Sequence, residues 1–274
     1  MTMTYDSWLK QATARLTTAG IDSARLDSLL LLEDVTGKNR TQLLAYPDIE
    51  PTTEQQNALD AMILRRLEHE PLAYIRGKSE FYGRTFTVDQ RVLVPRPESE
   101  DILDLLSEYN HVPTIIDVGT GSGALAVSAS LMCNNSVVYG LDVDPECLAL
   151  AQVNASNHQA AVTFLQSDLL RAMTEHAFTT PFAVLANLPY VPTGYAVNAA
   201  AMHEPKLALY GGKDGLDLYR VMFDQLREYE DEEIIVLTES LESQHTSLAG
   251  IAHDAGFVVA RSKGLIQAFT HLPV

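Results

Sequence analysis

From residue 114 onward, apolar runs of strand length alternate with stretches of helical character. The helical stretches begin near residues 124 and 144 and cover residues 216–229. Such alternation is typical of β-α-β units, in which a helix connects two parallel strands and packs on the sheet. It predicts an α/β fold built on a doubly wound parallel sheet with helices on both faces. The expected strands occupy residues 114–118, 137–141, 162–165, 182–185 and 233–237.

The N-terminal part of the chain has a different period. Trp8, Ala12 and Leu16 follow one another at i, i+4 and i+8, which places them on one helical face, and residues 53–67 continue the pattern. These residues predict a small all-helical unit.

Near Phe81 the period changes to two. Residues 85–88 and 91–94 flank a short polar turn, which predicts a β-hairpin, and Pro95 ends the second strand because it has no N–H to donate. We therefore expect three parts: a helical domain over residues 1–75, a hairpin linker over residues 76–97, and an α/β domain over residues 98–274.

Charge and composition restrict the partners. The formal net charge of −17 argues against a long nucleic acid, whose phosphates are bound by an excess of cations. The longest aliphatic run near the N-terminus, residues 29–32, is far below the roughly 20 residues of a membrane span. The first residues lack the features of a signal peptide, so we expect a cytoplasmic protein with no membrane partner. The histidines and cysteines show no metal-ligand spacing, which predicts reduced thiols and no metal site.

The first expected strand leads into a glycine-rich turn that reads DVGTGSG and opens a helix at Ala124. In an open sheet this turn lies at the carboxyl edge of the strands, where ligands bind. Glycine lets a ligand approach the backbone, and a helix N-terminus offers free N–H groups. We therefore predict a binding loop formed by Asp117, Gly119, Thr120, Gly121, Ser122 and Gly123.

Two ligands compete for this loop. Gly119-x-Gly121-x-x-Ala124 fits the dinucleotide pattern, so a nicotinamide-dependent oxidoreductase is one alternative. The carboxylate of Asp117 would repel a pyrophosphate, however, whereas S-adenosylmethionine carries an ammonium and a sulfonium and no phosphate. Asp142 ends the second strand, where a carboxylate can accept hydrogen bonds from both ribose hydroxyls, and Asp168 follows the third strand, near the expected adenine. These residues favour S-adenosylmethionine, with S-adenosylhomocysteine as the product.

The fourth expected strand opens onto the sequence Asn187-Leu188-Pro189-Tyr190. Asn187 lies at the same carboxyl edge as the glycine loop, so we also expect it at the cofactor site, facing the sulfonium. The amide oxygen of Asn187 and the backbone carbonyl of Leu188 can each accept one N–H of an NH₂ group, which would hold its nitrogen in line with a methyl donor. Pro189 limits backbone freedom and the ring of Tyr190 can stack on a flat acceptor. The loop therefore predicts methyl transfer to a planar nitrogen.

Several longer segments resemble one known family, the release-factor glutamine methyltransferases (PrmC/HemK). RVLVPRPESE resembles the family's PRPETE-containing interdomain segment, with Ser99 where threonine is usual. LTESLESQ is similar to a segment that reads E-x-G-x-x-Q. Similar matches cover EPLAYIRGKSEFYGRTFTV, IIDVGTGSGALA, LDVDPECLALAQVNA and HEPKLALYGGKDGLDLYR.

The resemblance implies methylation of the side-chain amide nitrogen (N5) of the glutamine in the Gly-Gly-Gln loop of peptide chain release factors. It also implies a seven-stranded Rossmann-like class I methyltransferase domain, joined by a β-hairpin to a small N-terminal helical domain that helps to bind the release factor. Carried over by position, residues 119–123 and Asp142 bind S-adenosylmethionine, Asp168 lies near adenine, and residues 187–190 hold the glutamine. Phe81 and residues 96–100 shape the wall of the site.

The sequence departs from the family at several positions. The acceptor loop usually reads Asn-Pro-Pro-Tyr, and Leu188 replaces the first proline, which removes rigidity on the order of 0.4–1 kcal/mol but leaves the backbone carbonyl in place. Ala183 stands where aspartate is common. The form Asn-Leu-Pro-Tyr is seen in ribosomal RNA adenine dimethyltransferases, so methylation of adenine N6 is a second alternative. A catalytically weakened interaction module is a third.

Overall fold

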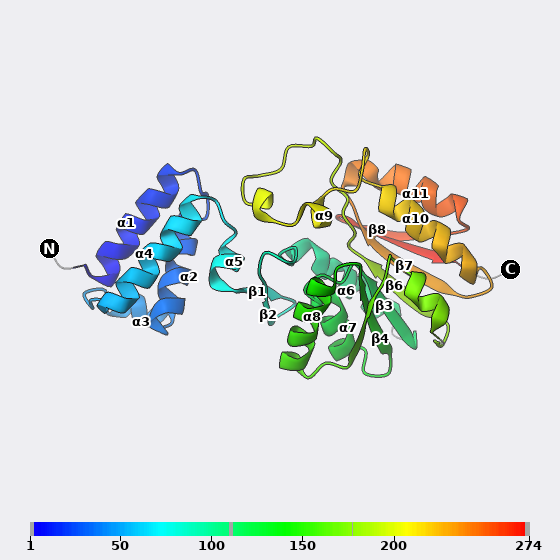
Figure 1. Ribbon diagram of the computed structural model, residues 1–274, viewed down its shortest axis with the longest axis horizontal. Helices are drawn as coiled ribbons and strands as arrows, with labels where there is room; N and C mark the ends of the chain where they lie inside the picture. Colours follow the sequence, from blue (N-terminus) through cyan, green and yellow to red (C-terminus); the bar gives the residue numbers. More distant parts are fainter. Residues whose placement is uncertain (1–2, 110–111, 177, 272–274) are drawn as a thin grey trace. The chain divides into compact units, whose positions relative to one another are not determined.

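The computed structural model describes residues 3–109, 112–176 and 178–271. The chain divides into two compact units (Figure 1). One contains Met1–Gly77 together with Val197–His203, and the other contains Lys78–Ala196 and Glu204–Val274. The sequence pattern predicts a boundary after residue 75 and places residues 197–203 in the α/β domain. Residues 197–203 fold with the helical unit instead. The sequence could not predict this, because a contact between segments far apart in the chain leaves no local pattern.

The first unit is helical. Trp8, Ala12 and Leu16 are buried on one face of its first helix, as the spacing predicts, and the fourth helix covers the expected residues 53–67. Buried Arg66 donates to the carboxylate of Asp27 at 2.7 Å. Its α-helices are α1 (Tyr5–Thr18), α2 (Ala24–Thr36), α3 (Arg40–Ala45), α4 (Thr53–Leu67) and α5 (Leu72–Arg76).

The second unit begins with a hairpin that differs from the predicted one. Its strands are β1 (Lys78–Phe81) and β2 (Arg84–Thr87), joined by Tyr82 and Gly83, which both have positive φ as in a tight two-residue turn. Residues 91–94 form no strand, so the predicted second strand is wrong. The period-two pattern there reflects the burial of two alternate valines, Val92 and Val94.

A seven-stranded sheet forms the centre of the second unit, in the order β5-β4-β3-β6-β7-β9-β8. The five strands from β5 to β7 are parallel, as predicted, whereas β9 and β8 are antiparallel, so the sheet is mixed. The chain order reverses between β3 and β6, which is the position where open α/β sheets bind ligands. The strands are β3 (Thr114–Val118), β4 (Val137–Asp142), β5 (Val162–Gln166), β6 (Phe182–Ala186), β7 (Ile234–Glu239), β8 (Val258–Lys263) and β9 (Ile266–His271).

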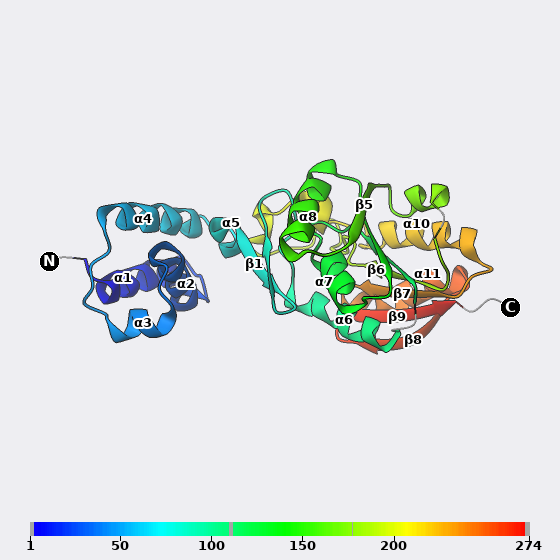
Figure 2. The same cartoon turned by 90° about the horizontal axis from the view of Figure 1, so that it is seen from below.

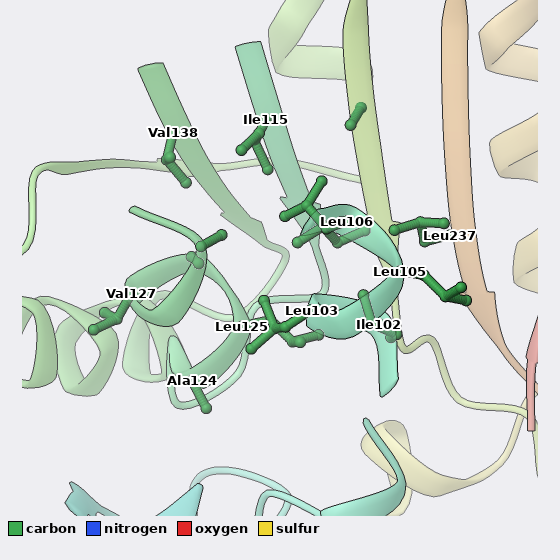
Figure 3. Close-up of a cluster of buried hydrophobic side chains, with 14 of the residues drawn as sticks. Ile102, Leu103, Leu105, Leu106, Ile115, Ala124, Leu125, Val127, Val138 and Leu237 are labelled. Atoms are coloured by element: carbon green, nitrogen blue, oxygen red, sulfur yellow. The ribbon is translucent and has the colours of Figure 1, made fainter. Parts of the chain in front are cut away.

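Helices cover both faces of the sheet (Figure 2). On one face, α6 (Glu100–Leu106), α7 (Ala124–Met132) and α8 (Pro145–His158) bury apolar side chains against the strands, and Figure 3 shows Leu106 of α6 beside Ile115 of β3. On the other face lie α10 (Asp217–Leu226) and α11 (His245–Asp254). The short helix α9 covers Lys206–Leu209, and 3₁₀ helices cover Pro97–Ser99, Ser107–Tyr109, Arg171–Glu175, Ala201–His203, Arg227–Tyr229 and Glu242–Gln244.

Within the part of the chain that the structure describes, no helix combines the length and the apolar character that crossing a bilayer requires.

Candidate active site

A cavity of about 330 Å³ opens at the carboxyl edge of the sheet, within the second unit. Its walls come largely from the turns that follow β3, β4, β5 and β6. The lining also includes Phe81, Arg91, Val92, Leu93, Pro95, Ser99, Pro205, Leu207, Ala208, Leu125 and Leu218. Of the residues selected from the sequence, those that line it are Gly119, Thr120, Gly121, Ser122, Asp142, Asp168, Asn187, Leu188 and Pro189, together with Phe81 and Ser99 of the expected wall. Asp117, Gly123 and Tyr190 are not part of the lining.

The glycine loop after β3 needs glycine for two physical reasons. Gly119, Gly121 and Gly123 have φ values of 73°, 53° and 79°, a region that other residues rarely adopt. A Cβ atom on Gly123 would also lie 3.0 Å from the Cβ of Ala151 in α8, so the close packing of α7 on α8 leaves no room for one. The conformation of the loop therefore requires glycine at three positions.

Asp117 holds this loop from behind. Its side chain is only 1% exposed, and its Oδ2 accepts hydrogen bonds from Thr120 Oγ1 at 2.6 Å and from the backbone N–H of Ala126 at 3.1 Å. Burial raises the pKa of Asp117 to about 7. The carboxylate, expected at the mouth of the site, instead faces the first turn of α7, because the hydroxyl and the N–H groups of the helix N-terminus attract it there.

Asp142 lies beside the loop, at the end of β4. Its Oδ2 accepts from the backbone N–H of Gly121 at 2.9 Å and its Oδ1 accepts from that of Asp144 at 3.0 Å. Burial raises its pKa. Asp144 caps α8 by accepting a hydrogen bond from the N–H of Glu146. The two neighbouring acids therefore have different roles: Asp144 caps the helix, and Asp142 joins the turn after β3 to the turn after β4.

Asp168 lies on the rim of the cavity, after β5. It is exposed and pairs with Arg171, with 3.2 Å between the Nε and Oδ2 atoms. An exposed pair of this kind contributes little to stability, so this carboxylate is free to exchange partners.

The acceptor loop begins directly after β6. Asn187 Nδ2 donates to Ser99 Oγ at 2.7 Å, and the backbone N–H of Leu188 donates to the hydroxyl of Tyr219 at 3.2 Å. Among the described residues, none donates to Asn187 Oδ1 or to the carbonyl oxygen of Leu188. Both oxygens can therefore accept hydrogen bonds from a ligand in the cavity.

Leu188 connects the two loops. Its side chain is 2% exposed, and its Cδ2 lies 3.2 Å from the position that a Cβ on Gly119 would occupy. The backbone N–H of Leu188 donates a hydrogen bond to the hydroxyl of Tyr219, which a proline at this position could not do. This hydrogen bond restrains the loop backbone, which lacks the usual proline ring.

Tyr190 is anchored at its hydroxyl, which donates to Glu239 Oε1 at 2.9 Å. Burial, together with the negative charge of Glu239, raises the pKa of this hydroxyl. The ring packs on the apolar cluster under α10 and α11. The expected stacking of this ring on an acceptor stays a prediction.

Three further side chains, those of Ser99, Glu239 and Gln244, support the acceptor loop. Ser99 donates to Glu239 Oε2 at 2.6 Å, and Gln244 Nε2 donates to the carbonyl oxygen of Tyr190 at 2.8 Å. Glu239 is 1% exposed at the end of β7. Ser99 lies in the PRPES segment and the other two in the LTESLESQ segment, which the family resemblance singles out. Ser99 and Glu239 are 140 positions apart, however, and such a separation gives no local signal of contact.

Arg96, another wall residue expected from the resemblance, pairs with Glu204, which is almost fully buried. This pair lies within the second unit and ties the PRPES segment to the stretch before α9.

Comparisons with known proteins agree with this arrangement. A family model described as the PrmC N-terminal domain matches residues 7–77, and a model described as ribosomal protein L11 methyltransferase (PrmA) matches residues 101–188. The release factor glutamine methyltransferase of Deinococcus radiodurans is 42% identical over 220 residues, which cover 77% of each chain. That of Geobacter sulfurreducens is 35% identical over 214 residues, 77% of this chain and 74% of the relative.

Among solved structures, the hMettl16 catalytic domain in complex with MAT2A 3'UTR hairpin 1 aligns with a TM-score of 0.56. The alignment covers 89% of this chain and 90% of that chain at 10% sequence identity. At this identity the likeness concerns the fold, which is that of a methyltransferase domain.

Proposed function

This chain belongs to the family of release factor glutamine methyltransferases, and on that premise we propose that it methylates the side-chain amide nitrogen (N5) of the glutamine in the Gly-Gly-Gln loop of peptide chain release factors. It is a methyltransferase, and S-adenosylmethionine is the proposed donor. The observation that carries the proposal is a pair of acceptor oxygens, Asn187 Oδ1 and Leu188 O, on two residues that line the same cavity as the glycine loop.

The glycine loop fits a nucleoside with no phosphate. The backbone N–H groups of Gly119 and Thr120 both donate to the carbonyl of Leu141, and that of Gly121 donates to Asp142. These N–H groups are therefore occupied within the protein, whereas a dinucleotide pyrophosphate needs them free. This occupation argues against a nicotinamide-dependent oxidoreductase.

Asp142 is the proposed ligand of the ribose. A carboxylate has about four lone-pair positions, and the backbone N–H groups of Gly121 and Asp144 use two of them. The remaining positions suit two vicinal hydroxyls, and Asp168 on the rim is the proposed partner of the adenine amino group. When bound, S-adenosylmethionine supplies an electrophilic methyl carbon on a sulfonium centre.

The acceptor loop supplies the other half of the chemistry. An amide nitrogen is a weak nucleophile because its lone pair is delocalised into the carbonyl. Asn187 Oδ1 and Leu188 O can each accept one N–H of the glutamine side chain, which orients the nitrogen and stabilises the positive charge that develops on it. Glutamine is thus held by both of its amide hydrogens, and the proton can leave after the methyl group has been transferred.

Methylation of adenine N6 and a binding role without turnover both have less support. Adenine also offers an NH₂ group, but the net charge of −17 disfavours a nucleic-acid substrate, and the relatives that cover most of the chain are named for release factors. An interaction module without turnover has no need of two unoccupied acceptor oxygens beside a donor loop.

Transfer of a labelled methyl group tests the proposal. The purified chain is incubated with labelled S-adenosylmethionine and either a peptide chain release factor or its variant with Gly-Gly-Ala in place of Gly-Gly-Gln. We expect label only in the unaltered release factor, in the peptide that contains the glutamine. Equal labelling of the Gly-Gly-Ala variant, or labelling of adenine in RNA with none in the release factor, would contradict the assignment.

A further inference from the structure

A chain of hydrogen bonds connects the buried end of β7 to the acceptor loop. Asn187 Nδ2 donates to Ser99 Oγ at 2.7 Å, and Ser99 Oγ donates to Glu239 Oε2 at 2.6 Å. Tyr190 donates to the other oxygen of the same carboxylate at 2.9 Å. Three segments that lie far apart in the sequence therefore meet around one buried acid.

The direction of these bonds follows from the chemistry of the groups. An ionised carboxylate can only accept hydrogen bonds, so Glu239 takes the single proton of the Ser99 hydroxyl. The Ser99 oxygen can then only accept, and the side of Asn187 that faces it must be the NH₂ group. With the amide turned round, two oxygens would face each other with no proton between them, which leaves a buried acceptor unsatisfied.

Opposing influences act on the charge of Glu239. Burial raises its pKa, whereas the hydrogen bonds from Ser99 and Tyr190 lower it and favour the ionised form. Arg96 also lowers the pKa and Glu98 raises it. The hydroxyls of Ser99 and Tyr190 join Glu239 to the acceptor loop. The same hydrogen bonds therefore orient the loop and stabilise the negative charge of Glu239.

We propose that Glu239 and Ser99 are positioning residues that hold the amide of Asn187 with its oxygen toward the substrate, and that this fixed orientation makes the site select a carboxamide and reject a carboxylate. The inference rests on the proposed function. A glutamine side chain offers two N–H donors to Asn187 Oδ1 and Leu188 O. A glutamate side chain would place its own oxygens against both acceptors, and sites built to pair with an N–H group reject analogues that lack one.

Two substitutions of Ser99 test whether its hydroxyl group is what orients Asn187. Ser99→Ala removes the link, and Asn187 can then adopt either amide orientation. Ser99→Thr keeps the hydroxyl and is the matched control. Glu239→Gln replaces one acceptor oxygen by an NH₂ group, which can donate to Ser99 and so reverse the bond to Asn187.

The readout is binding, measured by calorimetry with the S-adenosylhomocysteine-loaded enzyme. The ligands are a release factor and its variant with glutamate in place of the loop glutamine, and the quantity compared is the ratio of the two dissociation constants. We expect Ser99→Ala and Glu239→Gln to reduce this preference for glutamine at least tenfold, and Ser99→Thr to keep it within about twofold. A merely structural role of Ser99 would leave the ratio unchanged.

Methyl transfer to the release factor accompanies each binding measurement. If the unaltered enzyme transfers no methyl group to the release factor, the proposed function fails. If it does, yet Ser99→Ala and Glu239→Gln keep the full preference for glutamine, or Ser99→Thr loses it, the positioning role is refuted while the function stands. Should Ser99→Ala fail to fold, Glu239→Gln has nearly the same shape and carries the same test.

Discussion

The glycine loop after β3 and the acceptor loop after β6 lie at the same edge of the sheet but are held in different ways. The glycine loop is fixed by its own backbone conformation and by hydrogen bonds to Asp117 and Asp142, partners within 21 residues along the chain. Asn187 depends on Ser99, 88 residues away. Loops of the first kind are encoded locally, whereas loops of the second kind require the assembled fold, and the following substitutions separate the two.

The largest effect is expected at Asn187. In the proposed mechanism Asn187 supplies an acceptor that is used mainly in the transition state. Asn187→Ala should therefore lower the rate of methyl transfer at least ~100-fold, about 2.7 kcal/mol. Single-turnover transfer measures the rate, and calorimetry with S-adenosylhomocysteine should give a nearly unchanged dissociation constant. Asn157→Ala, at an exposed position of α8, is the control. Full activity of Asn187→Ala would remove this residue from the chemistry.

Asp142→Ala should give the converse pattern. If Asp142 hydrogen-bonds the ribose as proposed, loss of its carboxylate should weaken donor binding by about 1.5–3 kcal/mol, roughly ten- to a hundredfold. Calorimetric titration with S-adenosylhomocysteine measures the loss, and Asp224→Ala, at an exposed position of α10, is the control. A variant with normal donor affinity and a raised KM for the release factor alone would show that Asp142 does not bind the ribose.

The buried carboxyl of Asp117 predicts a pH dependence of stability. Its pKa is raised by burial to about 7 in the folded protein, above the unfolded value, so its favourable contribution exists at low pH and is lost as pH rises toward 7. The side chain of the Asp117→Asn variant cannot ionise. The free energy of unfolding of this variant minus that of the unaltered protein should therefore rise on the order of 2 kcal/mol between about pH 5 and pH 8. Urea unfolding at both pH values measures this difference. A constant difference would show that Asp117 titrates normally.

The smallest effect is expected where the loops touch. Gly119→Ala and Gly83→Ala introduce the same backbone strain, at φ values of 73° and 70°, but only the first places a Cβ against Leu188. Both should lose roughly 1 kcal/mol of stability. Gly119→Ala should in addition lower methyl transfer about tenfold, because Leu188 must move. Transfer rates that fall equally in both variants would show that the loops act independently.

Sequence patterns located most of the elements that build the site. The strands β3 to β7 lie within one or two residues of their predicted bounds. The pattern is strongest for β3, β6 and β7, because a parallel strand buried throughout needs continuous apolar side chains. The DVGTGSG turn was identified because its conformation requires glycine. The hairpin was misplaced, since alternate burial at residues 91–94 imitates a strand, and the antiparallel pair β8 and β9 was not predicted.

The sequence by itself determined which residues end at the carboxyl edge of the sheet, because strand formation and glycine turns depend on neighbouring residues. Only the tertiary structure decided that Asp117 turns away from the cavity toward α7, and that Ser99 links Asn187 to Glu239. Hydrogen bonds between distant side chains depend on how strands and helices pack, and packing is a property of the whole domain. The orientation of one amide group is therefore set by residues that no local pattern connects to it.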